Sequence, residues 1–229
     1  MSQTVEMHII ARIRSDFPTK FGIPRQSGLA DVPARIVFEP EYRNADALRG
    51  IEGFSHLWLI WQFSQAVREN WSPTVRPPRL GGNQRMGVFA TRSPFRPNPV
   101  GLSVVALKEV VLHGKDAPYL IVTGADLMDG TPIYDIKPYL PHIDSHPEAR
   151  GGFAVQAAAH RLHVVFPEAW LSQVPAHLRE PLTELLAQDP RPSYQHDPER
   201  VYGFPFAGME IRFTVQAETL TVCSVTPEK

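Results

Sequence analysis

Residues 87–101, with the sequence GVFATRSPFRPNPVG, constrain this chain most, because they hold three prolines in a short polar stretch. Proline fixes φ and lacks the N–H donor, so Pro94, Pro97 and Pro99 exclude a helix or a central strand here. The segment is predicted to be a stiff loop that loses little conformational entropy on binding. Its polar side chains are Arg92, Ser93, Arg96 and Asn98. Function concentrates on loops held by rigid scaffolds, so we favour a binding site over a surface connection packed by Phe95.

The overall composition is that of an ordinary globular protein. The chain has 229 residues, of which 43% are hydrophobic and 21% charged, enough for one large domain or a domain with a smaller unit. The longest apolar tract, residues 57–63, is far shorter than the ~18 residues of a membrane span. The first ten residues lack the pattern of a secretory signal, and the single cysteine, Cys223, forms no intrachain disulfide. We therefore expect a cytoplasmic protein with no membrane association.

The charge is unevenly distributed along the chain. The formal net charge of −1 argues against a uniformly basic nucleic-acid binder, but residues 68–96 hold six arginines and one acid, Glu69. Such a basic island suits a local contact with phosphates, because neutralising them releases counterions. A solvated charged surface explains the same pattern equally well.

Alternating or clustered apolar residues predict many short strands and few helices. Strands are expected at residues 5–14, 35–38, 54–63 (buried on both faces), 88–90, 102–112, 119–125, 133–136, 164–166, 209–215 and 219–225. A short helix over 45–49 is expected to be capped by Asn44. A second helix over 176–188 buries Leu178, Leu182, Leu185 and Leu186, and Pro181 should kink it or start a new helix.

This pattern predicts a mainly β protein, a small β-barrel or sandwich rather than a doubly wound fold. A polar stretch with a Gly-Gly pair, residues 142–152, is the expected boundary. It separates a barrel domain, 1–150, from a smaller α+β C-terminal domain, 151–229.

Several common motifs are absent from the sequence. It has no G-x-G-x-x-G after a strand and no P-loop, so a Rossmann nucleotide site has no support. Ser93 lacks the glycines of a nucleophile elbow, and His142 and His146 are flanked by prolines, so no metal site is expected. What remains are proline-stiffened polar loops at 24–26, 76–82, 92–99, 129–132 and 189–194. On one rim of a barrel they would offer arginines, amides and carboxylates to a nucleotide-like ligand and a polyanion.

Four long motifs carry a resemblance to a known family. They are PRLGG (78–82), GVFATRSPFRPNPVGLS (87–103), DLMDGTPIYDIKPYLP (126–141) and LAQDPRPSY (186–194). Together they resemble the TsaA-like family, most closely its bacterial TrmO-type tRNA adenine-N6 methyltransferases, over essentially the whole chain. The resemblance implies a homodimeric, non-Rossmann β-barrel methyltransferase that uses S-adenosyl-L-methionine. Its implied substrate is N6-threonylcarbamoyladenosine at position 37, next to the anticodon of threonine tRNAs.

The resemblance also implies a set of cofactor contacts. They fall on Pro24, Arg25, Gln26, Ser64, Gln65, Arg92, Leu102, Asp129, Gly130, Thr131 and Pro132. The family often has His-Gln where this chain has Ser64-Gln65, so no imidazole is available at that position.

Methyl transfer to an acylated N6 requires a group that accepts its proton, because that nitrogen is a poor nucleophile. The candidates are Asp126, Asp129 and Asp135, with Tyr139 and Tyr194 as stacking or hydrogen-bonding partners. Any of these aspartates could instead form a turn, an interpretation that is stronger for Asp126. Arg92 or Arg96 could pair with the threonyl carboxylate, and the other proposed substrate contacts are Arg76, Arg79, Arg85, Asn98, Arg191 and Tyr194.

Two other functions remain open at this point. One is a non-catalytic tRNA-binding module, and the other is a nucleotide or phosphoester hydrolase on a barrel scaffold.

Overall fold

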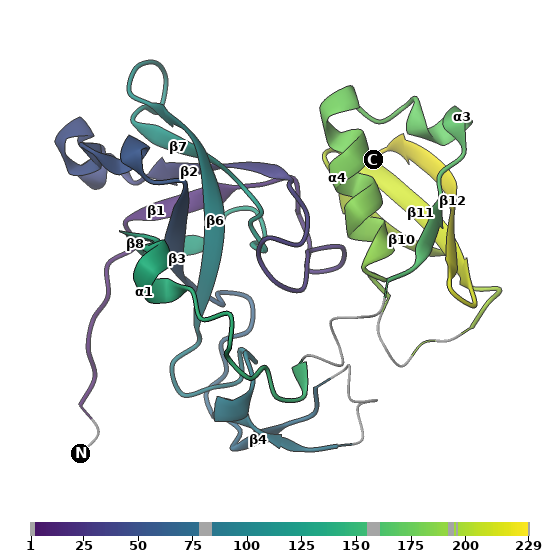
Figure 1. Ribbon diagram of the computed structural model, residues 1–229, viewed down its shortest axis with the longest axis horizontal. Helices are drawn as coiled ribbons and strands as arrows, with labels where there is room; N and C mark the ends of the chain where they lie inside the picture. Colours follow the sequence, from purple (N-terminus) through teal and green to yellow (C-terminus); the bar gives the residue numbers. More distant parts are fainter. Residues whose placement is uncertain (1–2, 78–83, 155–160, 192–194, 196, 229) are drawn as a thin grey trace.

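Six antiparallel strands from the N-terminal part of the chain close into a barrel, in the order β1-β2-β7-β6-β3-β8 (Figure 1). The computed structural model describes residues 3–77, 84–154, 161–191, 195 and 197–228. The strands are β1 (Ala11–Arg14), β2 (Pro33–Phe38), β3 (His56–Gln62), β6 (Val100–Val111), β7 (Tyr119–Thr123) and β8 (Pro132–Pro138). Ala11 pairs with Ile133, which joins β1 to β8 and closes the barrel. The predicted mainly β barrel is confirmed.

Alternation along β3 shows how the barrel core is built. Leu57, Leu59 and Trp61 are buried in the core, while the residues between them are half-buried. The prediction that this strand is buried on both faces is wrong, because a barrel strand turns only one face to the interior. On the other face Trp58 packs against Tyr139, with ring centroids 5.7 Å apart.

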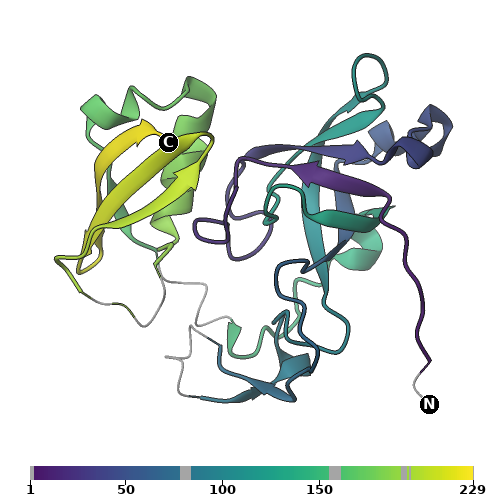
Figure 2. The same ribbon diagram turned by 180° about the vertical axis from the view of Figure 1, so that it is seen from behind.

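Two predicted strands differ in the structure. The strand expected over 5–14 begins only at Ala11, because Ala11 already pairs with Phe38, the last residue of β2. Val5 is 81% exposed, and the N-terminal segment runs away from the barrel (Figure 2). Residues 88–90, also expected to be a strand, form a single 3-10 turn that buries Val88.

Short elements lie around the barrel. They are η1 (Pro40–Tyr42), η2 (Ala45–Leu48), η3 (Ile51–Gly53), β4 (Thr74–Val75), β5 (Met86–Gly87), η5 (Val88–Ala90) and α1 (Pro141–Asp144). The helix expected after Asn44 is the 3-10 helix η2, and Asn44 caps it as predicted by accepting from the Asp46 N–H at 2.9 Å.

The C-terminal part forms a mixed four-stranded sheet, in the order β10-β11-β12-β9, with β9 parallel to β12. Its elements are β9 (His163–Val165), α3 (Glu168–Leu171), α4 (Ala176–Ala187), β10 (Tyr202–Phe206), β11 (Met209–Gln216) and β12 (Thr219–Pro227). The predicted hairpin is β11–β12, and the four predicted leucines of α4 are buried. Pro181 lies inside one continuous α4 and does not start a new helix.

The loop between β1 and β2 packs into the C-terminal core. Phe17, Ala30 and Val32 from this loop are buried in the same cluster as the leucines of α4. The rings of Phe17 and Phe206 lie 5.6 Å apart. We propose the division into domains 1–150 and 151–229, with the loop from the first domain completing the core of the second.

Candidate functional site

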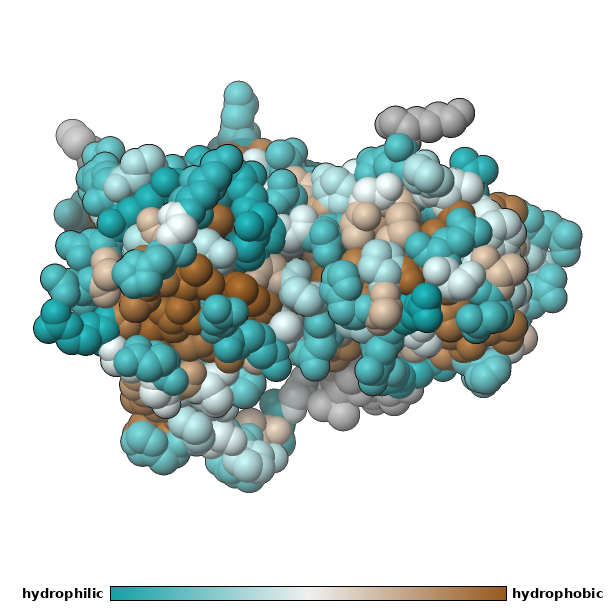
Figure 3. All heavy atoms as spheres, turned by 90° about the horizontal axis from the view of Figure 1, so that it is seen from above, coloured by the Kyte–Doolittle hydropathy of each residue, from teal (hydrophilic) through white to brown (hydrophobic). Residues whose placement is uncertain are grey.

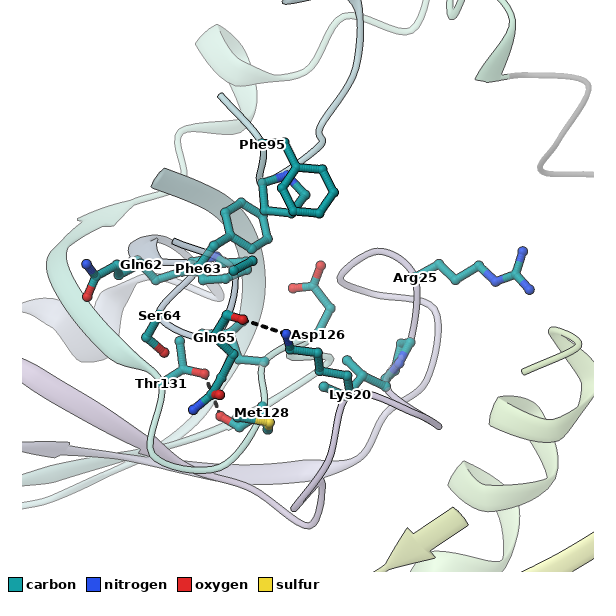
Figure 4. A pocket seen from close by; sticks show the side chains of 16 residues that line it. Lys20, Arg25, Gln62, Phe63, Ser64, Gln65, Phe95, Asp126, Met128 and Thr131 are labelled. Carbon is teal, nitrogen blue, oxygen red and sulfur yellow. Dashed lines mark hydrogen bonds between the residues drawn. The ribbon is translucent and has the colours of Figure 1, made fainter. Parts of the chain in front are cut away.

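A cavity of about 420 Å³ lies at the end of the barrel where β3 ends (Figure 4). Its walls come from the loop after β1, the residues that follow β3, the proline-rich loop and the turn before β8. The lining residues are Lys20, Ile23, Pro24, Arg25, Trp61, Gln62, Phe63, Ser64, Gln65, Ala66, Pro94, Phe95, Asp126, Leu127, Met128 and Thr131. Three of the five predicted polar loops therefore meet at one rim, namely 24–26, 92–99 and 129–132. The volume is that of a small-molecule site.

Aromatic side chains form part of the cavity wall. The rings of Trp61 and Phe63 lie 4.3 Å apart at their centroids, and Phe95 contributes a further ring. Gly101 pairs with Trp61 between β3 and β6 and leaves room for its indole. A Cβ at Gly101 would lie 2.3 Å from Cε2 of Trp61. The wall thus offers apolar, flat surfaces of the kind that hold a heteroaromatic ring.

A chain of two hydrogen bonds positions Asp126 at the cavity. The Nε1–H of Trp61 donates to Oγ of Ser103 (2.9 Å), and the Ser103 hydroxyl donates to Oδ1 of Asp126 (2.6 Å). Burial raises the pKa of the Asp126 carboxyl, although the Ser103 hydrogen bond and the positive charge of Arg92 act against it. A carboxyl with a raised pKa in a cavity is a candidate general base.

Arg92 and Gln26 join two of the loops that surround the cavity. Nη1 of Arg92 donates to Oε1 of Gln26. Neither residue lines the cavity, yet the charge of Arg92 acts on Asp126. The structure therefore brings the predicted residues Gln26, Arg92 and Asp126 into one neighbourhood.

Arg25 connects the cavity to the C-terminal part of the chain. Its side chain extends away from the cavity (Figure 4), and its Nη2 donates to the carbonyl oxygens of Asp189 (2.6 Å) and Arg191 (3.0 Å). Arg191 in turn donates to both carboxylate oxygens of Asp189, at 2.8 and 2.9 Å, and its side chain is only 9% exposed. Arg191, predicted to bind substrate, is thus committed to a buried ion pair in this structure.

The predicted cofactor contacts at 129–132 lie beside the cavity, but only Thr131 lines it. Oδ1 of Asp129 accepts a hydrogen bond from the Ser15 N–H at 3.1 Å, and its Oδ2 lies 3.7 Å from Nη1 of Arg14. The carbonyl oxygen of Gly130 accepts a hydrogen bond from Nη1 of Arg12. Pro132 begins β8, and Leu102 on β6 is 53% exposed outside the cavity. Of the predicted cofactor contacts, those in the lining are Pro24, Arg25, Ser64, Gln65 and Thr131.

Two predicted catalytic residues lie away from the cavity. Asp135 pairs with Ile60 in the β3–β8 ladder, and its carboxylate lies 2.8 Å from the ammonium of Lys137. The Tyr139 N–H donates to the carbonyl oxygen of His56, at the opposite end of β3 from the cavity. Neither residue lines the cavity with Asp126.

The predicted substrate arginines lie largely at the surface. Arg76 and Arg85 flank the β4–β5 ribbon and are exposed, as is Asn98. Arg96 is half-buried and donates to the carbonyl oxygen of Thr91 at 3.4 Å. Arg79 and Tyr194 lie outside the described residues.

The sequence reasoning missed several residues of the cavity. Lys20 lines it and donates from Nζ to the carbonyl oxygen of Gln65 at 2.7 Å. Trp61 and Phe63 were treated as strand core only, and Ser103 was not singled out. A tryptophan and a serine on two predicted strands were the available signal, but they are diagonal neighbours, since Trp61 pairs with Gly101 and Ser103 with Leu59, and strand register cannot be read from one sequence.

Among residues 3–77, 84–154, 161–191, 195 and 197–228, no helix is long and apolar enough to cross a membrane. In the same part of the chain no cluster of three or more His, Cys, Asp or Glu side chains is arranged to hold a metal ion.

A closed barrel without a Rossmann sheet, with a loop-built cavity holding a carboxylate and aromatic rings, defines a class of barrel proteins with a small-molecule site. Family models identify the particular family: the tRNA-methyltransferase O N-terminal domain matches residues 12–145, and the TrmO C-terminal domain matches residues 159–228. The chain belongs to the TrmO family.

Individual relatives agree with this assignment. A tRNA (adenine(37)-N6)-methyltransferase of Escherichia coli strain K12 is 45% identical over 227 residues, which cover 95% of this chain and 96% of the relative. A putative S-adenosylmethionine-dependent methyltransferase of Pseudomonas aeruginosa is 44% identical, covering 89% and 90%. A crystal structure of TrmO from P. aeruginosa superposes with a TM-score of 0.78 at 36% identity and covers 99% of each chain.

Proposed function

We propose that this chain transfers a methyl group from S-adenosyl-L-methionine to N6 of the adenosine at position 37 of tRNA. The single observation that carries this proposal is the cavity, which combines aromatic walls with the partly buried carboxylate of Asp126. The TrmO family membership and the relative in E. coli support the same activity.

The cavity suits the chemistry of S-adenosyl-L-methionine, which carries an adenine ring, a sulfonium cation and an amino-acid end. Trp61, Phe63 and Phe95 offer apolar ring surfaces, Asp126 offers a negative charge, and Lys20 offers a cation for a carboxylate. Bound there, the cofactor supplies an electrophilic methyl group. We keep the eleven contacts implied by the family resemblance as a proposal, of which Pro24, Arg25, Ser64, Gln65 and Thr131 line the cavity.

Asp126 is the proton acceptor that the geometry supports best. N6 must lose a proton when it gains the methyl group, and a carboxylate within reach of the cavity can accept it. Burial gives Asp126 a higher proton affinity than an ordinary carboxylate, and the Ser103 hydroxyl fixes its orientation. Asp129, Asp135 and Tyr139 are weaker candidates because they lie outside the cavity of this subunit.

The finer points of the proposal concern the target and the assembly. We propose that the target is N6-threonylcarbamoyladenosine of threonine tRNAs, as the four sequence motifs imply, and that the protein works in the cytoplasm. We also propose a homodimer. Apolar surface gathers on the barrel half of the face seen in Figure 3, and exposed Leu102 on β6 is in keeping with a partner subunit.

A labelled methyl donor tests the activity directly. Purified protein is incubated with S-adenosyl-L-methionine labelled in its methyl group and with tRNA from cells that lack this enzyme. We expect label in tRNA with the wild type, and at least a 100-fold lower rate with Asp126→Asn. Asp46→Asn is the matched control, because Asp46 is exposed and pairs only locally with Arg49.

Binding and hydrolysis measurements on the same protein distinguish the methyltransferase from the two alternative functions. Calorimetry with S-adenosyl-L-methionine should give binding for the methyltransferase, whereas RNA binding without cofactor binding would support a tRNA-binding module. Hydrolysis of a nucleotide or phosphoester without cofactor would contradict the proposal.

A further inference from the structure

An exposed pair of aromatic rings lies outside the cavity on the segment around β4 and β5. Trp71 is 49% exposed and Phe89 is 72% exposed. Their ring centroids lie 6.0 Å apart with an interplanar angle of 23°, so the two rings are stacked. Contiguous exposed apolar surface, unlike single exposed apolar residues, marks candidate binding sites, and the two stacked rings form one such surface.

Backbone hydrogen bonds fix this pair next to the cavity. The N–H of Ser72 donates to the carbonyl oxygen of Phe95 at 3.3 Å, and Phe95 lines the cavity. The N–H of Val88 donates to the carbonyl oxygen of Pro73 at 3.0 Å. Trp71 and Phe89 are therefore each one residue away from an anchored position, and their spacing does not depend on flexible side chains alone.

The surroundings of the pair are cationic. The guanidinium of Arg68 lies 3.6 Å from the ring centroid of Phe95. In the sequence, Arg68 falls between the lining residue Ala66 and Trp71. Arg76 and Arg85 are exposed on either side of β4 and β5. Glu69 is the acid of this stretch, so the local charge remains strongly positive.

We propose that Trp71 and Phe89 form a stacking platform for an unpaired nucleobase that flanks the target adenosine in the anticodon loop. This proposal rests on the proposed function and adds the neighbouring base as a recognised part of the substrate. Proteins recognise single-stranded RNA by stacking bases on aromatic rings, with arginines nearby for the backbone phosphates. The target base beside the cofactor at the cavity and its neighbour on the platform would be held by one continuous surface.

The charge argues against a second copy of this chain as the occupant. Two copies facing each other through this surface would bring Arg68, Arg76 and Arg85 close to the same arginines of the other copy, which is unfavourable. An RNA loop has the opposite charge and unpaired bases, so it matches both features of the surface.

Stem-loop RNAs test the platform. Three synthetic anticodon stem-loops carrying the modified target base are compared: one intact, one abasic on the 5′ side of the target and one abasic on its 3′ side. Each is titrated against the wild type, Phe89→Leu and Trp71→Leu, which keep apolar side chains but remove an aromatic face. Leu112→Ala is the control, since Leu112 is an exposed apolar residue that follows the far end of β6.

We expect Phe89→Leu and Trp71→Leu to bind the intact RNA about tenfold more weakly, with unchanged affinity for S-adenosyl-L-methionine. One abasic RNA should weaken wild-type binding by a similar factor, and the variants should then lose little more, because the same contact is already missing. The Leu112→Ala variant should bind like the wild type.

Two results would overturn the platform. One is equal RNA affinity of wild type and both aromatic variants, and the other is a change of oligomeric state in sedimentation as the sole effect of the substitutions. Failure of the proposed function looks different, because the wild type would then bind the RNA without methylating it.

Discussion

Ser103→Ala removes the hydroxyl that links Trp61 to Asp126 beside the cavity. Ser103 is 1% exposed, and its Oγ makes both hydrogen bonds, at 2.9 and 2.6 Å. A hydrogen bond to a charged group contributes about 1.5–3 kcal/mol, and leaving the buried indole N–H without its acceptor adds about 1 kcal/mol. We expect the free energy of unfolding to fall by about 2–4 kcal/mol at neutral pH.

The pH dependence of that loss identifies its cause. Burial raises the pKa of Asp126 in the folded protein above its value in the unfolded chain. Between these two pKa values the folded protein still binds a proton that the unfolded chain has released, so the free energy of unfolding falls as the pH rises through this range. The variant lacks the hydroxyl that stabilises the ionised carboxyl, so its pKa is raised further and the fall extends to higher pH. The difference between the wild type and the variant should be small at acid pH and reach its full size above the pKa of the variant.

Urea unfolding at a series of pH values measures this difference. Thr123→Val is the control, because it removes another buried hydroxyl whose bond to Asp31 is longer, at 3.4 Å. In the methyl-transfer assay, the acid limb of the pH–rate profile should move to higher pH in Ser103→Ala. A loss of stability independent of pH, or an unshifted profile, would refute the role given to the Ser103–Asp126 bond.

Three further substitutions test the packing around the site. Gly101→Ala places a Cβ 2.3 Å from Cε2 of Trp61. We expect the free energy of unfolding in urea to fall by about 1–3 kcal/mol and cofactor binding in calorimetry to weaken. Unchanged cofactor affinity would contradict the role of Trp61 in the cavity wall. Gly22→Ala places a Cβ 2.3 Å from Cδ2 of Phe204, at a residue whose φ is +91°. The free energy of unfolding should fall by about 2–4 kcal/mol. An unchanged melting temperature would argue against the packing of this loop on β10. Arg25→Ala removes donors to the carbonyl oxygens of Asp189 and Arg191 and should lower the free energy of unfolding by about 1–3 kcal/mol, with wild-type stability as the opposing outcome.

The barrel could be predicted from the sequence because its signals are local. Runs of apolar residues mark β3, β6 and β7, and prolines mark the connections between strands. The errors arose where a strand needs a partner. Residues 5–10 alternate like a strand, but β2 ends opposite Ala11, so the ladder stops there.

The cavity could be predicted only in part. The prolines of 92–99 and the turn at 129–132 predicted rigid loops, and both loops contribute residues to the rim of the cavity. The Trp61–Ser103–Asp126 chain depends on the register between β3 and β6 and could not be derived from spacing alone. Arg191 looked like a free cation in the sequence, whereas in the fold it forms a salt bridge with Asp189 at 2.8 Å.

The activity itself is tested most directly by mass spectrometry of tRNA nucleosides. Threonine tRNA carrying N6-threonylcarbamoyladenosine is incubated with this protein and S-adenosyl-L-methionine, digested, and compared with a reaction lacking the protein. The account predicts that the modified adenosine gains the mass of one methylene group, with the new methyl group on N6, and that Asp126→Asn leaves it unchanged. Unaltered nucleosides in the wild-type reaction, or a methyl group on another base, would contradict it.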